Sequence, residues 1–119
     1  MGHYKGSCHC GAVTFEVETD LSAAMMCDCS ICRRKNAVMT AVTQDNITIT
    51  SGEDNLSLYQ FNMMAAKHYF CKTCGIYTHH KRRRDDLIGI NTGCLENLDP
   101  ADLPEVTYIE GSQFSTVEK

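Results

Sequence analysis

The chain has 119 residues, 43% of them hydrophobic, and this length fits one domain over residues 1–119. Its formal net charge of −4 argues against general binding to nucleic acid. No segment approaches the roughly 20 apolar residues of a membrane span, and the first residues lack the apolar run of a signal peptide. We therefore expect a cytoplasmic protein with no membrane partner.

Short segments of alternating apolar and polar residues predict a mainly β protein. The first is 13–18, where Val13, Phe15 and Val17 alternate with polar residues after a glycine turn. Further strands are expected at 38–43, 47–50, 56–61, 68–70, 76–79, 87–91 and 106–109. We interpret 51–55 as a hairpin connection between two of them.

Helix signals are weak. Residues 30–35 favour one helical turn with a serine N-cap. Residues 97–103 favour a short turn or 3₁₀ segment around Pro100. No long amphipathic helix is expected, so strands and their connections must position any site.

Eight cysteines are the most distinctive feature of the composition. A reducing cytosol keeps thiols free, so this number predicts metal binding or thiol chemistry, with four disulfides as the alternative. Seven of the eight fall into three groups with short spacing. The groups are Cys8 and Cys10; Cys27, Cys29 and Cys32; and Cys71 and Cys74. They suffice for two zinc ions per chain.

The first predicted site combines Cys8 and Cys10 with Cys71 and Cys74. Four thiolates in two close pairs on separate segments can converge on one tetrahedral zinc ion. The glycine that follows each pair suits a tight turn. We predict a structural zinc ion that ties the N-terminal segment to the middle of the chain and contributes to folding.

The second predicted site is the triplet of Cys27, Cys29 and Cys32. Three thiolates leave one zinc position open, as catalytic sites do, and a soft ligand such as the thiol of glutathione suits that position. Closure of the site by a fourth ligand is an alternative, as are an iron–sulfur cluster and a site without metal. The candidate closing ligands are Asp28, His79, His80 and Cys94.

Basic and histidine residues supply candidates for ligand binding and catalysis. Arg33 and Arg34 directly follow the triplet and are candidates for binding a ligand there. The run 81–84 favours a solvated hairpin tip over carboxylate capture. His79 and His80 are candidate proton carriers, and because they alternate along a strand only one of them can face a given site.

The cysteine motifs read, in order, Gly6-Ser7-Cys8-His9-Cys10-Gly11, Cys27-Asp28-Cys29-Ser30-Ile31-Cys32-Arg33 and Phe70-Cys71-Lys72-Thr73-Cys74-Gly75. This succession resembles the glutathione-dependent formaldehyde-activating family, which includes centromere protein V. The resemblance implies a β-tent of stacked antiparallel sheets stabilised by zinc. It also implies structural ligands at Cys8, Cys10, Cys71 and Cys74 and active-site ligands at Cys27, Cys29 and Cys32.

Two hypotheses of function follow. The resemblance implies a zinc-dependent carbon–sulfur lyase that forms or cleaves an S-hydroxymethyl adduct of a glutathione-like thiol and an aldehyde such as formaldehyde. The alternative is a non-catalytic, zinc-stabilised module that binds a protein or a small ligand. An open second site favours the enzyme, and a second site closed by Cys94 favours the binding module.

Overall fold

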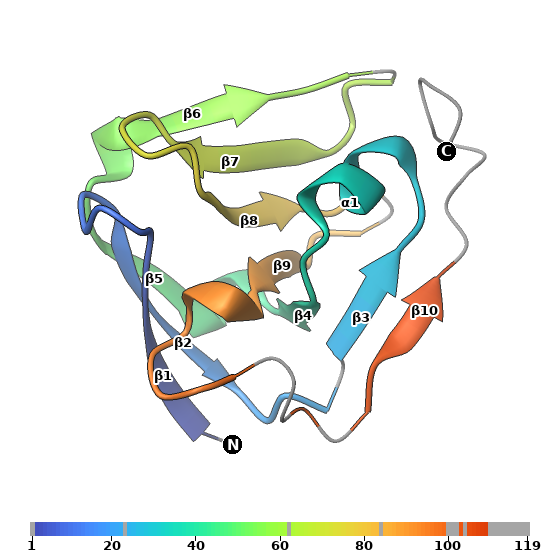
Figure 1. Ribbon diagram of the computed structural model, residues 1–119, viewed down its shortest axis with the longest axis horizontal. Coiled ribbons are helices and arrows are strands. Elements are labelled where there is room, and N and C mark those ends of the chain that lie inside the picture. Colours follow the sequence, from blue (N-terminus) through green and yellow to red (C-terminus); the bar gives the residue numbers. More distant parts are fainter. Residues whose placement is uncertain are drawn as a thin grey trace.

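The computed structural model describes residues 2–22, 24–61, 63–83, 85–99, 103 and 105–109. Within these residues the chain forms ten strands and one short α-helix, α1 (Ser30–Lys35) (Figure 1). The strands are β1 (Gly2–Ser7), β2 (Thr14–Thr19), β3 (Ala24–Cys27), β4 (Met39–Val42), β5 (Ile47–Ser51), β6 (Leu56–Tyr59), β7 (Lys67–Cys71), β8 (Tyr77–Lys81), β9 (Ile88–Asn91) and β10 (Thr107–Ile109). In this part of the chain no helix has the length and apolar character needed to cross a membrane.

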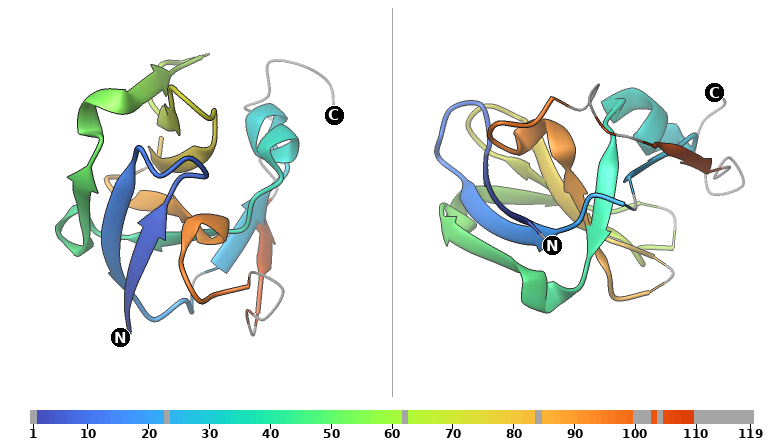
Figure 2. Two further views of the ribbon diagram at one scale, coloured as in Figure 1. Left: turned by 60° about the vertical axis from the view of Figure 1, so that its left-hand side comes forward. Right: turned by 90° about the horizontal axis from the view of Figure 1, so that it is seen from below.

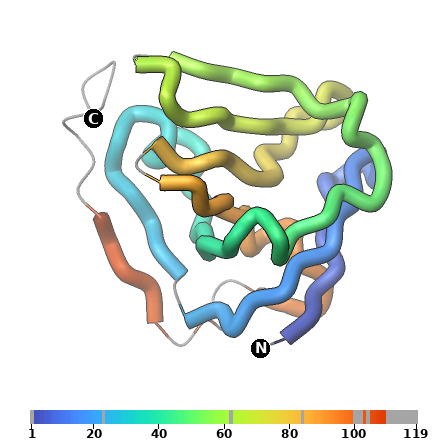
Figure 3. The backbone as a smooth tube through the Cα atoms, turned by 180° about the vertical axis from the view of Figure 1, so that it is seen from behind, coloured from blue at the N-terminus to red at the C-terminus, as the bar shows by residue number. Residues whose placement is uncertain are grey.

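The strands form two sheets. The smaller has the order β1-β2-β5, and the larger has the order β10-β3-β4-β9-β8-β7-β6. Figure 2 shows the small sheet lying against the larger one, and Figure 3 shows β6 and β7 at one end of the large sheet and β3 with β10 at the other. The prediction of a mainly β fold with stacked sheets is confirmed. The sheets are antiparallel except for β10, which pairs with β3 in parallel.

The main core lies between the sheets. Phe15 and Val17 on β2 are each 1% exposed and belong to one apolar cluster with Val42 on β4 and Ile90 on β9. The alternation predicted for 13–18 is therefore confirmed. Val13, on the same face of that segment, is fully buried in a second cluster that contains cysteines. The segment 13–18 therefore packs against the apolar core at one end and against the cysteines of a candidate metal site at the other.

Three local predictions were wrong or incomplete. The segment 51–55 is not a hairpin connection, because β5 pairs with β2 and β6 pairs with β7, so the chain passes there from one sheet to the other. Helix α1 was correctly placed, but its N-cap is Cys29 and no side chain caps it. Strands β1 and β3 were not predicted. Part of the segment 97–103 lies outside the described residues.

Candidate functional site

The sulfurs of Cys8, Cys10, Cys71 and Cys74 lie within 4.8 Å of one another. The Cys10 sulfur is 3.6 Å from that of Cys8 and 3.7 Å from that of Cys71. In a tetrahedral site with Zn–S bonds of about 2.3 Å, neighbouring sulfurs lie about 3.8 Å apart. The four side chains therefore fit a zinc ion without rearrangement.

Two tight turns hold this first cluster. Gly11 and Gly75, which follow the cysteine pairs, have φ angles of +83° and +79°, a region that other residues adopt only with strain. Backbone N–H groups at each turn support the sulfurs, and that of Val13 donates to the Cys8 sulfur over 3.3 Å. The side-chain amide of Asn55 donates to the Cys71 sulfur over 3.4 Å. Such donors stabilise sulfur in its thiolate form.

The second cluster is formed by Cys27, Cys29 and Cys32. Their sulfurs also lie within 4.8 Å of one another. Cys27 ends β3, Cys29 caps α1, and Cys32 lies in the first turn of that helix. The sequence places three sulfurs on one short bend, because the strand ends and the helix begins within two residues. The cluster therefore depends on α1 for its geometry.

Contacts among these sulfurs shift their proton affinities. The neighbouring Cys27 and Cys32 sulfurs lower the pKa of Cys29. Contacts with Cys27 and Cys29 raise the pKa of Cys32. These contacts favour a thiolate at Cys29, and thiolate is the form of cysteine that binds a metal ion.

The described residues bring no fourth ligand to this cluster. Cys94 and Asp28, both candidates for closing it, are not among the residues whose ligand atoms converge there. The buried Cys94 sulfur instead contacts the backbone oxygen of Tyr77 at 3.7 Å, and burial raises its pKa to about 11. Among the residues with described positions, three thiolates and an adjacent cavity make up the second site.

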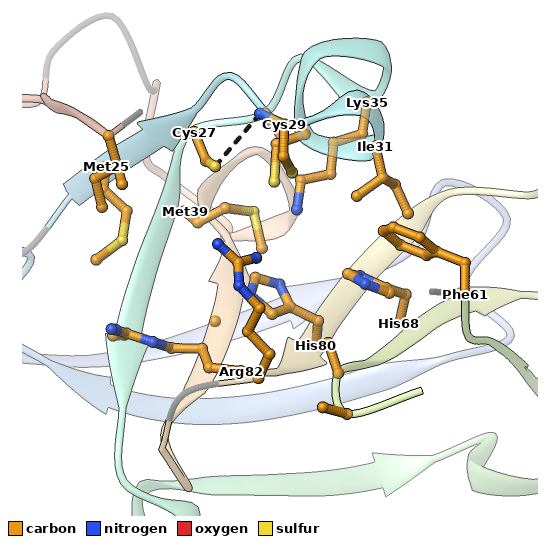
Figure 4. A pocket seen from close by; sticks show the side chains of 18 of the residues that line it. Met25, Cys27, Cys29, Ile31, Lys35, Met39, Phe61, His68, His80 and Arg82 are labelled. Atoms are coloured by element: carbon orange, nitrogen blue, oxygen red, sulfur yellow. Dashed lines mark hydrogen bonds between the residues drawn. The ribbon is translucent and has the colours of Figure 1, made fainter. Parts of the chain in front are cut away.

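A cavity of about 90 Å³ opens beside the second cluster (Figure 4). All three of its cysteines line the wall. The rest of the wall comes from the face of the large sheet and from the loop after β6, with α1 on one side. Its apolar part includes Met25, Ile31, Met39 and Phe61. This volume has room for a few water molecules or a small organic molecule.

Lys35 reaches the cavity from the last turn of α1. Figure 4 shows its side chain passing Cys29 and pointing into the cavity. The Nζ atom is buried and has no hydrogen-bond partner in the described part of the chain. It lies 4.1 Å from the centroid of the Tyr77 ring. Burial lowers the pKa of Lys35, while thiolate charge on Cys32 and Cys29 opposes this shift.

Two histidines form the opposite wall. His68 on β7 has its Nδ1 atom 2.6 Å from the Tyr77 hydroxyl, and burial lowers its pKa to about 4. His80 on β8 has a buried Nδ1 atom without a hydrogen-bond partner among the described residues. Burial, with a smaller contribution from the charge of Lys35, lowers the pKa of His80 to about 2. Both imidazoles are therefore neutral at physiological pH.

Because side chains alternate along β8, His79 and His80 point to opposite faces of the sheet. His80 lines the cavity, whereas His79 does not. His79 is buried on the other side of β8, where its ring stacks on Tyr69 at a centroid distance of 4.8 Å and its Nδ1 lies 2.9 Å from the Thr78 hydroxyl. This position makes His79 a packed residue of the sheet and leaves His80 as the histidine candidate.

The predicted basic residues are placed differently from expectation. Arg33 and Arg34 are exposed and do not line the cavity. Arg34 instead donates to the backbone oxygen of Ser30, 3.0 Å away in the same helix. Arg82 and Arg83 line the cavity, although the run 81–84 was predicted to be a solvated tip.

Acidic residues balance part of the charge of that run. Arg82 lies 3.3 Å from a carboxylate oxygen of Asp85, and Lys81 lies 3.5 Å from one of Asp86. The sequence reasoning missed Lys35, His68 and Tyr77 as site residues. No short motif contains them, since they come from α1, β7 and β8 and meet only when the strands pair.

Comparisons with known proteins agree with this arrangement. Residues 3–110 match the model of a family described as "Glutathione-dependent formaldehyde-activating enzyme". The matched range contains all seven clustered cysteines and the described wall of the cavity. The chain is also similar to a Rhodobacter sphaeroides protein of known crystal structure. The two share 48% identity with a TM-score of 0.83, over 87% of this chain and 98% of the other.

Proposed function

Because the chain belongs to the glutathione-dependent formaldehyde-activating enzyme family, we propose that it is a zinc-dependent carbon–sulfur lyase. Its substrates are a thiol such as glutathione and an aldehyde such as formaldehyde, and their adduct is an S-hydroxymethyl thiol. The reaction takes place in the cytoplasm, where glutathione is abundant and thiols stay reduced.

The two cysteine clusters have different roles in this proposal. Cys8, Cys10, Cys71 and Cys74 hold a structural zinc ion, because their four sulfurs complete a tetrahedron. Cys27, Cys29 and Cys32 hold the second ion at the cavity wall. A zinc ion there would supply a Lewis acid that keeps the substrate thiol in its thiolate form.

His80 is the residue that we assign to the carbonyl oxygen of the aldehyde. Its low pKa makes its imidazole a weak base, but the neutral ring keeps one N–H group that can donate a hydrogen bond. Negative charge develops on the carbonyl oxygen as sulfur attacks the carbon, and a fixed donor stabilises that charge. His80 lines the cavity and its Nδ1 atom has no hydrogen-bond partner among the described residues, which is consistent with a hydrogen bond that forms only with substrate.

The observation that carries the proposal is the position of the second cluster at a cavity wall. A purely structural site usually closes all four positions with protein ligands. Here three sulfurs converge, all three cysteines line the cavity, and Cys94, the cysteine that could have been a fourth ligand, lies elsewhere. This arrangement favours the enzyme over a zinc-stabilised binding module.

The test begins with metal analysis of protein purified without added metal, followed by zinc-edge X-ray absorption with and without glutathione. We expect two zinc ions per chain and one additional Zn–S contact when glutathione is added. NMR with ¹³C-formaldehyde should show the S-hydroxymethyl adduct forming faster than it does without protein. If glutathione changes neither the zinc spectrum nor the rate, the binding-module hypothesis replaces the enzyme.

A further inference from the structure

Lys35 is a buried cation whose environment is incomplete. Its ammonium group carries three N–H donors, yet among the described residues no oxygen or nitrogen atom accepts a hydrogen bond from Nζ. Its neighbours are the face of the Tyr77 ring and the sulfur of Cys32. A buried charge is costly unless a hydrogen-bonded partner of opposite charge accompanies it. An anion in the cavity would supply that partner.

Apart from the three cysteine sulfurs of the second cluster, the charged side chains in the described part of the cavity wall are all cationic. Three cationic side chains line it, Lys35, Arg82 and Arg83, and no carboxylate does. The charge of Arg82 is partly balanced by Asp85 at 3.3 Å, whereas no carboxylate within the described residues pairs with Lys35. The cavity therefore favours an anionic ligand, and Lys35 is the group best placed to receive it.

We propose that Lys35 binds the carboxylate of the carbonyl substrate, and that this substrate is a small 2-oxo acid of the glyoxylate type. The inference rests on the proposed function, because it assumes that the thiol is held at Cys27, Cys29 and Cys32. A 2-oxo acid carries a negative charge, which formaldehyde lacks. The cavity of about 90 Å³ suits a molecule of this size.

Because Lys35 lies beside the Cys32 sulfur, we assign the carboxylate that it binds to the carbonyl substrate and not to glutathione. In the adduct of a thiol with a 2-oxo acid, a single carbon atom separates the sulfur from the carboxylate. In glutathione, several atoms that include a peptide bond separate the sulfur from either carboxylate. An anion that must lie close to both the cluster and Lys35 therefore belongs to the carbonyl substrate.

The reaction balances without an oxidant or a further reactant. The thiol sulfur forms a bond to the aldehyde carbon, and the π electrons of the carbonyl group move to its oxygen. The proton that the thiol gives up ends on that oxygen. Thiol and glyoxylate thus become a single hemithioacetal that keeps its carboxylate, and cleavage is the reverse reaction.

Direct binding to the zinc-loaded protein is the first experiment. Thioglycolate places a carboxylate one carbon from its sulfur, and 2-mercaptoethanol has a neutral hydroxymethyl group in place of that carboxylate. By calorimetry we expect thioglycolate to bind about tenfold or more tightly than 2-mercaptoethanol. Lys35→Met should abolish this preference. Lys67→Met, which removes an exposed cation outside the cavity wall, should keep it.

Kinetics distinguish the two sources of the carboxylate. With glyoxylate and the uncharged 2-mercaptoethanol, we expect Lys35→Met to raise KM for glyoxylate about tenfold or more, and to change KM for formaldehyde little. If the variant instead raises KM for glutathione equally with both aldehydes, the carboxylate belongs to the thiol and the inference is overturned.

Three further results would separate this inference from its premise. If the wild-type protein binds both thiols equally well, thiol binding stands but Lys35 does not select a carboxylate. If Lys35→Met loses one zinc ion, as metal analysis would show, Lys35 only balances the charge of the thiolates. If the wild-type protein binds no thiol at all, the proposed function itself fails.

Discussion

The Lys35 ammonium lies 4.1 Å from the centroid of the Tyr77 ring, so the last turn of α1 is bound to the middle of the large sheet. The hydroxyl of the same tyrosine lies 2.6 Å from His68 Nδ1. Tyr77 therefore links the helix that carries the ligand candidate Cys32 to the histidine wall of the cavity. Burial raises the pKa of Tyr77, which keeps the hydroxyl protonated.

Substitutions of Tyr77 should separate these two contacts. Tyr77→Phe keeps the ring beneath Lys35 and loses only the hydrogen bond to His68, so we expect a loss of about 1 kcal/mol in the free energy of unfolding. Tyr77→Leu also removes the cation–π contact, worth about 0.5–2 kcal/mol, and should cost more. Urea denaturation measures both. Equal losses would mean that the Lys35 contact contributes nothing to stability.

Loss of a ligand from the first cluster should destabilise the whole domain. Cys71 is fully buried beside Val13, and structural zinc sites in small peptides contribute about 10–16 kcal/mol to folding. We expect Cys71→Ser to lose one zinc ion per chain and to lower Tm sharply, as metal analysis and calorimetry would show. Cys94→Ala is the matched control, because Cys94 is buried but lies outside both clusters. It should keep both zinc ions.

Loss of a ligand from the second cluster should have a milder effect on the fold. The cysteines there lie at the cavity wall, away from the core around Phe15 and Ile90. We expect Cys29→Ser to lose one zinc ion and all lyase activity, with a smaller drop in Tm than Cys71→Ser. Circular dichroism and metal analysis test this. A drop as large as that of Cys71→Ser would show that the second cluster is also structural.

Gly89 determines where the His80 ring lies. The two residues are paired across β8 and β9, and a Cβ atom at position 89 would stand 2.8 Å from the ring Nε2. We therefore expect Gly89→Ala to displace the ring and to lower kcat about 10²-fold, a typical contribution of a positioned proton-transfer or hydrogen-bonding group.

A double mutant tests whether this effect passes through the ring. In a His80→Ala background, Gly89→Ala should cost no further activity, since there is no ring to displace. Gly93→Ala is the control glycine, because its nearest contact is Asn91 Oδ1 at 3.2 Å and it does not line the cavity. Additive losses in the double mutant would contradict this role of Gly89.

The buried His79 should make stability depend on pH. Burial lowers its pKa from 6.5 to about 4 in the folded chain. Between these values the unfolded chain takes up the proton first, so the free energy of unfolding falls as pH falls from about 6.5 to about 4. His79→Gln should flatten this slope in urea titrations at several pH values. An unchanged slope would show that His79 does not contribute to it.

Much of the site could be predicted because its signals are local. Zinc ligands that are two or three residues apart must lie close together, so the spacing of Cys27, Cys29 and Cys32 was enough to indicate that their sulfurs converge. The alternation of side chains along a strand predicted that His79 and His80 would face different ways, and they do.

Other features depend on the path of the chain and on the direction of α1, which the sequence pattern did not indicate. The segment 51–55 has hairpin composition, but the pairing of β5 with β2 decided its course. Arg33 and Arg34 were expected at the ligand because they follow the triplet, yet the direction of α1 turns both to solvent. Lys35, one residue further, faces the cavity because helical residues in succession point about 100° apart.

The sequence by itself determined the β character, the two groups of thiolates and the burial of β2, because all three follow from residue spacing over a few positions. Only the tertiary structure decided that α1 lies beside the cavity, that His80 lies over Gly89, and that Lys35 meets Tyr77. These contacts join residues up to about forty positions apart. They depend on sheet register, which is set by the packing of the whole core and not by any one segment.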